Sequence, residues 1–556
     1  MFVFVLGRGN GALLSLTYKK RSIAPGPKTG RSISPRTVME CVSIPESFFG
    51  TFCSQKVQYP PVPYEQSMQK IVPLQGSDCR ETRKRHRSPL RPPPCKVLCA
   101  MAQQASPQLL GTEKISTLLL RYAIPSIIAM TASSLYNLMD SVFIGHGVGP
   151  MALSGLGITM PLMNLGAAFG SLVGIGASTL LSIKMGQNDR SSARIILGNV
   201  IILNTLIGLL YTSVCLPLLD PILTFFGASE NTIGYARSYM LIILGGNVIT
   251  HIYLGLNDML RASGYPGRAM AIMLTAVGLN CLLNGLFIFG FGWGIAGAAW
   301  ATVLAQVTAM GLELRHFLDP KSLIHFTRST IRLKQSIVKG ILSIGMAPFL
   351  MYVCSSVIVI LINKSLLHHG GDFYIGAYSN VNRIAMLFLM VVMGLNQGMQ
   401  PIVGYNFGAR KIDRVIRTWK YVVCCAVSVT TTGFLVCQLF PRYITLLFTD
   451  DPTLLSISSH ALRIVLAMFP FVGFQMVTSN FFQSIGMAPK AIFLSLTRQL
   501  LFLIPFLLVL PIFFEADGVW MSMPLADAAA TTLAAILLWK QFGKFRRMQQ
   551  SAATTL

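Results

Sequence analysis

Twelve apolar segments, each long enough to cross a lipid bilayer, follow one another from Ile115 to the end of the chain, and short polar loops separate them. A helix needs about 20 predominantly apolar residues to cross the hydrocarbon core, so this pattern predicts twelve transmembrane helices. Their centres fall near residues 131, 170, 206, 245, 280 and 306, and then 350, 390, 429, 466, 502 and 530. The expected fold class is therefore an all-α polytopic membrane protein.

An internal repeat divides these segments into two sets of six. Ala123-Ile124-Pro125 recurs as Met346-Ala347-Pro348, and the loop KMGQNDRSSA recurs as NFGARKIDRV, with Gly186 matched to Gly408. The loop LRASGYPGRA likewise matches FQSIGMAPKA. Because each copy holds an even number of spans, the two copies have the same orientation, and parallel repeats of this kind enclose a binding cavity near the midplane. We expect an N-lobe over 112–318, a linker over 319–338, a C-lobe over 339–542 and a tail over 543–556.

The distribution of charge predicts the orientation. Charged residues make up only 12% of the chain and apolar residues 53%, while the net charge is +25. Beyond residue 100 most Lys and Arg residues lie in alternate loops, which the positive-inside rule assigns to the cytoplasm. Both termini are therefore expected in the cytoplasm, and this location of the charge argues against a nucleic-acid partner.

Residues 1–100 differ from the rest in being basic and rich in Pro and Ser, as in RKRHRSPLRPPP. Three interpretations remain open: a disordered leader, an organelle transit peptide, or sequence upstream of a natural start at Met101. We favour the third.

One carboxylate stands out, because Asp140 is a lone acid inside the apolar first span. Ionisable groups at such positions usually mark an ion or substrate pathway. A rise of about 1.5 Å per residue places Asp140 roughly 6 Å below the outer boundary, Asn284 and Thr302 about 10 Å and Asn280 about 16 Å. Asn280 and Asn284 share one helix face. We predict a proton or sodium site at these four residues, because the second repeat keeps the scaffold but loses most of the cluster.

Other candidates are weaker. Arg383 and Arg463 lie in the eighth and tenth spans and are candidates to line a C-lobe cavity, and Asp527 in the twelfth span is a candidate partner for either. We favour structural ion pairing over substrate contact for these three. Neither an H-E-x-x-H motif nor paired intramembrane carboxylates indicate an enzyme, and we expect no metal or cofactor other than the coupling ion.

The stretch LYNLMDSVFIGHGVGPMALSGLGI, followed by IKMGQNDRSSA, LRASGYPGRA and GIAGAAWATVLAQ, resembles the multidrug and toxic compound extrusion (MATE) family. The resemblance covers nearly all of residues 112–545. It is closest to the DinF/MepA-type bacterial branch, because the first-span carboxylate is present and the seventh and tenth spans lack the acidic site of the NorM-type branch. It implies a V-shaped, twelve-helix antiporter that exports organic cations in exchange for protons or sodium.

The resemblance also assigns residue roles. The cation site of the family falls on Asp140, Asn280, Asn284 and Thr302, and the family adds Asn257, although hydropathy places Asn257 near the cytoplasmic end. Pro125 matches a first-span proline at which this branch bends. The family often has a second aspartate where this chain has Asn284, which weakens the case for tight sodium binding.

The expected function is export of small organic cations from the bacterial cytoplasmic (inner) membrane, by a monomer that alternates between two states. Two alternatives stay open: a flippase for lipid-linked precursors within the same superfamily, and a membrane scaffold or channel that does not transport against a gradient.

Overall fold

The computed structural model describes residues 107–554 apart from positions 328, 329, 331 and 450, so the expectations for residues 1–100 lie outside the described part of the chain. The first half contains the helices η2 (Pro107–Gly111), α2 (Ile115–Gly147), α3 (Pro150–Gly186), α4 (Arg190–Cys215), α5 (Leu219–Phe225), α6 (Glu230–Gly245), α7 (Asn247–Ala262), α8 (Pro266–Asn284), η3 (Gly285–Gly290) and α9 (Gly294–Leu318). The second half contains α10 (Gln335–Gly370), α11 (Asp372–Gly408), α12 (Ile412–Leu439), α13 (Pro441–Thr445), α14 (Pro452–Val465), α15 (Phe469–Ser484), α16 (Ala488–Leu496), η4 (Thr497–Leu503) and α17 (Ile504–Thr554).

Within residues 107–554, the lengths and hydropathy of the helices account for twelve membrane crossings. Ten helical segments of the described chain are long and apolar enough to cross a bilayer, and α14 with α15, bent by 54°, makes an eleventh. The last of these segments, Ala488–Gln550, has 63 residues. At about 1.5 Å per residue it would measure roughly 95 Å, about three times the thickness of a hydrocarbon core. This segment must therefore hold two spans.

The break in that segment falls at Glu515, whose φ of 48° and ψ of −129° are not helical. The chain reverses there, and a Cβ atom built on Gly518 would lie 2.4 Å from the carbonyl oxygen of Leu510. The eleventh span thus ends within α17 and the remainder of α17 forms the twelfth span. These observations confirm the all-α, twelve-span fold class.

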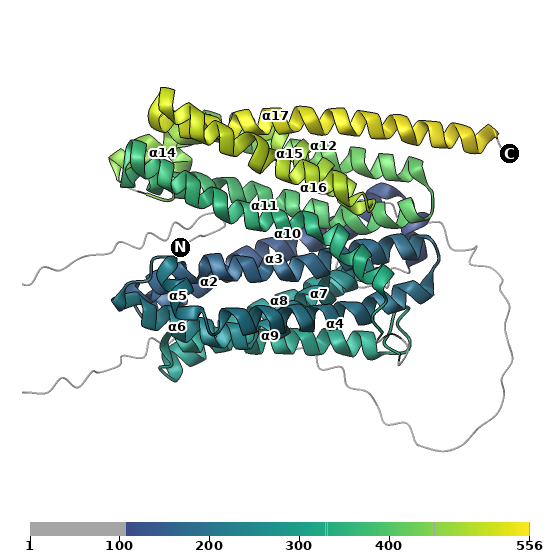
Figure 1. The fold of residues 1–556 in the computed structure, drawn as a ribbon, viewed down its shortest axis with the longest axis horizontal. Coiled ribbons are helices and arrows are strands. Elements are labelled where there is room, and N and C mark those ends of the chain that lie inside the picture. The colour runs from purple at the N-terminus through teal and green to yellow at the C-terminus, as the bar shows by residue number, and fades with distance from the viewer. Residues whose placement is uncertain (1–106, 328–329, 331, 450, 555–556) are drawn as a thin grey trace, which may run out of the picture. The chain divides into compact units, whose positions relative to one another are not determined.

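The helices form two lobes, an N-lobe of α2–α9 and a C-lobe of α10–α17, which Figure 1 shows in blue to teal and in green to yellow. The first helix of each lobe crosses into the other lobe. Leu118 and Tyr122 at the start of α2 belong to the C-lobe core, whereas Ile144 at its end belongs to the N-lobe core. In α10, Ile341 packs in the N-lobe core and Ile362 in the C-lobe core.

A repeat-related pair of glycines makes close contacts between the lobes at the ends of α3 and α11. A Cβ atom on Gly186, at the end of α3, would lie 2.0 Å from the carbonyl oxygen of Tyr405. A Cβ atom on Gly408, at the end of α11, would lie 2.1 Å from the carbonyl oxygen of Ile183. Each helix end therefore packs directly on the backbone of the other lobe, and only glycine permits this approach.

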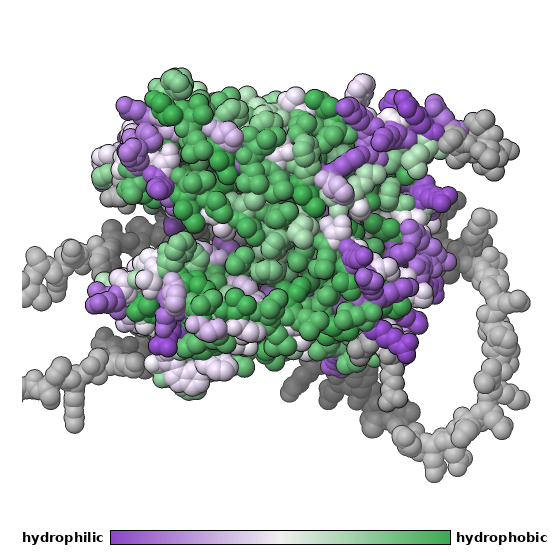
Figure 2. All heavy atoms as spheres, in the orientation of Figure 1, coloured by the Kyte–Doolittle hydropathy of each residue, from purple (hydrophilic) through white to green (hydrophobic). Residues whose placement is uncertain are grey.

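Polar side chains gather at the two ends of the helix bundle, and Figure 2 shows a broad apolar surface between them. The end where α3, α7, α9 and α11 finish carries most of the Lys and Arg residues, and we call it the basic end. Asp189 caps α4 there by accepting from the backbone N–H of Ser192. Hydrogen bonds from Ser192 and Ser191, together with the charge of Lys184, lower the pKa of Asp189 to about 2.

Candidate functional site

Asp140 lies in a chain of hydrogen bonds between three helices. Its Oδ1 atom accepts from Nδ2 of Asn284 at 2.5 Å, and the same Asn284 nitrogen donates to Oδ1 of Asn280 at 3.0 Å. Nδ2 of Asn280 donates to the Thr302 hydroxyl at 3.3 Å, which also accepts from the Tyr136 hydroxyl at 2.8 Å. The four residues selected from the sequence are thus joined in one network, which we call the Asp140 network.

Local sequence explains this convergence. Asn280 and Asn284 are four residues apart on α8 and so project from the same face. Asn284 is the last α-helical residue before the π-helical turn η3, and such turns are often found at functional sites. The side chains of Asp140 and Thr302 come from α2 and α9, and both asparagines are fully buried.

The Asp140 network lacks a basic partner within the described residues. Asp140 is 6% exposed and takes part in none of the ion pairs found there. Oδ1 of Asn284 is buried and has no hydrogen-bond partner. A buried carboxylate without a counter-charge is costly, and an orphaned oxygen beside it is an open position for a positive ion or a proton.

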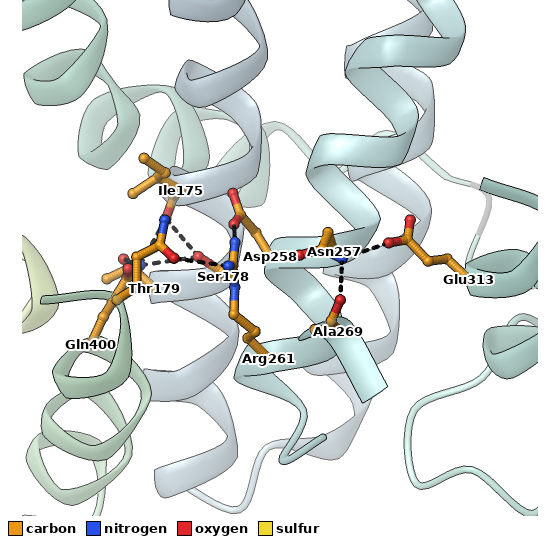
Figure 3. A network of polar contacts seen from close by, with 10 residues as sticks. Ile175, Ser178, Thr179, Asn257, Asp258, Arg261, Ala269, Glu313 and Gln400 are labelled. Carbon is orange, nitrogen blue, oxygen red and sulfur yellow. Dashed lines mark hydrogen bonds and ion pairs between the residues drawn. The ribbon is translucent and has the colours of Figure 1, made fainter. Parts of the chain in front are cut away.

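Asn257 does not join this network. It lies on α7, where its Nδ2 atom donates to Oε1 of Glu313 at 2.8 Å and to the carbonyl oxygen of Ala269 at 3.3 Å. Figure 3 shows this second cluster, and Glu313 lies five residues before the end of α9, which finishes at the basic end. The position of Asn257 agrees with the hydropathy estimate, which placed it far from Asp140.

The C-lobe candidates are arranged differently from the expected pairing. Asp527 accepts from Nε of Arg498 at 2.5 Å, not from Arg383 or Arg463, which are both exposed. Asp527 and Arg498 line a cavity of ≈ 240 Å³ within the C-lobe, and neither of the other two arginines is among its lining residues. The expected pairing was wrong because α16 begins at Ala488, so Arg498 lies ten residues, about 15 Å, along the helical segment, where it reaches Asp527.

Sequence reasoning missed three residues that share these clusters: Tyr136, Glu313 and Arg498. Tyr136 precedes Asp140 by one helical turn and therefore shares its face. Glu313 is a lone acid in an apolar span, the same signal that identified Asp140.

A helical membrane protein with two repeat-related lobes and a buried polar network near one end has the architecture of a membrane transporter. The MatE family model matches this chain twice, over residues 125–286 and 345–509, once in each half of the predicted repeat. These two segments cover more than half of the chain, and the chain belongs to the MatE family.

Similar proteins agree with this assignment. The multidrug export protein MepA of Staphylococcus aureus (strain N315) is 25% identical over 428 residues, which cover 76% of this chain and 93% of MepA. A solved structure of the MATE multidrug transporter DinF-BH matches with a TM-score of 0.73 and 35% identity, over 79% of this chain and 98% of DinF-BH. A MATE family transporter of the MOP superfamily, solved in an outward-facing conformation, matches with a TM-score of 0.74 and 25% identity, over 80% of this chain and 99% of that one.

Proposed function

We propose that this chain is a multidrug exporter of an inner membrane, which exchanges organic cations for protons or sodium ions by alternating access. The observation that carries this proposal is the Asp140 network, a buried carboxylate that has no counter-charge among the described residues and lies beside an amide oxygen without a hydrogen-bond partner there. The family assignment and the similarity to MepA and DinF-BH support the transport of drugs. The protein works as a monomer with both termini and the basic end in the cytoplasm.

Cation loading changes the hydrogen bonds of the Asp140 network. The ionised Asp140 accepts an N–H from Asn284. A protonated Asp140 instead has an O–H to donate, and the Asn284 amide oxygen, which has no partner, is an acceptor for it once the amide rotates. Protonation therefore removes the cost of a buried charge and reverses one hydrogen bond between α2 and α8.

The ligand set favours a proton over sodium. Hard cations bind in cages of several oxygen atoms. In the Asp140 network, Oδ1 of Asn280 and the Thr302 hydroxyl already accept hydrogen bonds, so few free oxygens remain for a metal ion. A proton needs only one.

Helix α2 transmits this change to both lobes. Its outer part holds Asp140 in the N-lobe, while Leu118 and Tyr122 at its other end pack in the C-lobe core. Pro125 lies buried between these two parts. A proline inside a helix removes one backbone hydrogen bond and permits a kink, so a change at Asp140 can alter the bend of α2 and the relation of the lobes.

The lobes meet at the basic end through contacts such as Gly186 on Tyr405 and Gly408 on Ile183. Closure on the cytoplasmic side corresponds to an outward-facing transporter, which receives a proton and releases the drug. The C-lobe cavity, where Asp527 and Arg498 neutralise each other, does not favour the anionic head group of a lipid-linked precursor.

The test is transport in proteoliposomes that contain the full chain. Efflux of ethidium, a fluorescent organic cation, is followed under a pH gradient alone and under a sodium gradient alone. We expect the pH gradient to concentrate ethidium against its own gradient. Equal ethidium concentrations on both sides under either gradient would instead indicate a channel or a scaffold.

A further inference from the structure

A second buried acid of the N-lobe lies outside the Asp140 network. Glu313, on α9, is 0% exposed. Its Oε1 atom accepts one hydrogen bond, from Asn257, and its Oε2 atom is buried without a partner. Figure 3 shows Glu313 and Asn257 pointing toward each other from facing helices.

Within the described part of the chain, Glu313 has no basic partner of its own. It forms none of the ion pairs found within residues 107–554. Tyr253, Asp258 and Arg261, all on α7, interact with it electrostatically, but Arg261 is already paired with Asp258. Arg268, at the start of α8, contacts His316. A fully buried carboxylate that has no ion-pair partner and one oxygen without a hydrogen bond is costly to keep as an anion.

The surroundings of Glu313 suit a proton and not a metal ion. The Asn257 amide directs its N–H groups at Oε1 of Glu313 and at the Ala269 carbonyl oxygen, which leaves Oε2 of Glu313 as the unpartnered oxygen. One oxygen atom can hold a proton, whereas a hard cation requires a cage of several.

Helix α7 connects Glu313 to the contact between the lobes. Asn257 lies one turn before Arg261, whose guanidinium donates to Oε1 of Gln397 on α11 at 2.8 Å. Figure 3 also shows Gln400 of α11 reaching Ser178 and Thr179 of α3, with bonds of 3.0 and 2.5 Å. Opening of the lobes at the basic end would break these contacts, one of which is made by α7, the helix that carries the amide partner of Glu313.

The geometry points to Glu313 as a second proton site of the N-lobe, with Asn257 as its amide partner, so that each transport cycle carries two protons. Asp140, toward the outer end, and Glu313, toward the basic end, each take a proton while the transporter faces outward, and each release it while the transporter faces the cytoplasm. The two sites share α9, because Glu313 lies on it and Asp140 is linked to Thr302 on it through Asn284 and Asn280. This inference rests on the proposed proton-coupled export of organic cations.

The number of protons exchanged per ethidium follows from the proton gradient and the ethidium gradient at which net transport stops. In proteoliposomes with the membrane potential clamped at zero, the ethidium gradient at zero net flux is measured against the imposed proton gradient. One proton per ethidium lets a tenfold proton gradient balance about a tenfold ethidium gradient, whereas two protons let it balance about a 100-fold gradient. We expect about 100-fold for the unchanged protein and for the control Glu230→Gln, an exposed acid on the outer side. We expect about tenfold for Glu313→Gln.

An ethidium gradient of about tenfold for the unchanged protein, or of about 100-fold for Glu313→Gln, would overturn the proposal of a second proton site. If the unchanged protein balances at about tenfold and Asp140→Asn abolishes proton-driven transport, the proposed function stands and only this inference fails.

Infrared spectroscopy of the purified full chain gives a measurement that needs no transport. A protonated buried carboxylic acid has a carbonyl band that an ionised carboxylate lacks. We expect the unchanged protein to show such a band at neutral pH and Glu313→Gln to lack it. In Glu313→Asp, which keeps a carboxylic acid at this position, we expect the band at a shifted frequency. Identical carbonyl bands in all three proteins would overturn the inference.

Discussion

A methyl group added at Gly186 or Gly408 should hold the lobes apart at the basic end. In the closed contact the new Cβ atom would lie 2.0 Å from the Tyr405 carbonyl oxygen or 2.1 Å from that of Ile183. Both clashes are with backbone atoms, so rotation of a side chain cannot relieve them. The backbones of α3 and α11 must separate instead.

The free-energy cost of separating the two backbones follows from known effects of overpacking. Overpacking in a tight contact typically costs about 1–3 kcal/mol. The cost applies only to the conformation in which the lobes touch, so it shifts the equilibrium toward the conformation open at the basic end. A difference of about 1–3 kcal/mol corresponds to roughly a 5–150-fold change in the ratio of the two conformations.

Spin labels on Arg190 and Arg417, which are exposed on the N-lobe and the C-lobe, report the separation of the lobes. In a cysteine-free background, Gly186→Ala and Gly408→Ala should each increase the population with a long distance between labels. The matched control is Gly311→Ala on α9, because a Cβ atom there meets nothing within 4 Å. A distance distribution that is the same in Gly186→Ala, Gly408→Ala and the control would refute the assignment of this contact as the closed cytoplasmic side.

Three further substitutions test separate parts of the account. Asn284→Asp adds a second carboxylate beside Asp140, so ethidium transport should become driven mainly by sodium; an unchanged ion preference would count against the ligand argument. Pro125→Ala restores a backbone donor within α2 and stiffens it, so transport should fall on the order of tenfold while the repeat-related Pro348→Ala has a smaller effect; equal effects would contradict the role of the α2 bend. Asp527→Asn leaves Arg498 unpaired and should destabilise the protein by about 1–3 kcal/mol in thermal unfolding. The double substitution Asp527→Leu with Arg498→Met should recover this stability, whereas an unchanged melting temperature in Asp527→Asn would show that the ion pair is dispensable.

Much of the fold could be predicted because the membrane imposes a simple rule on the sequence. A backbone in lipid must satisfy its own hydrogen bonds, so each long apolar run becomes a helix, and hydropathy alone locates it. The internal repeat predicted the two-lobe arrangement. The crossing of α2 and α10 between lobes could not be predicted from the sequence. Leu118 and Ile341 have the same apolar character as other residues of transmembrane helices, and only the packing shows which core each one joins.

The candidate site was predictable to the extent that depth and helix face follow from counting residues. This procedure brought Asp140, Asn280, Asn284 and Thr302 to one place. It could not assign Asp527 to a partner, because the start of α16 at Ala488 and the π-helical turn η4 decide where Arg498 points. Helix boundaries and local changes of helical pitch depend on tertiary contacts, which hydropathy does not record.

The central claim is that a positive ion bound at Asp140 drives drug export. The most direct measurement is ethidium transport in proteoliposomes by the Asp140→Asn protein, under a pH gradient and under a sodium gradient in turn, with the fold checked by its melting temperature. We expect a folded protein that no longer concentrates ethidium under either gradient. Transport by folded Asp140→Asn at the rate of the unchanged protein would contradict it.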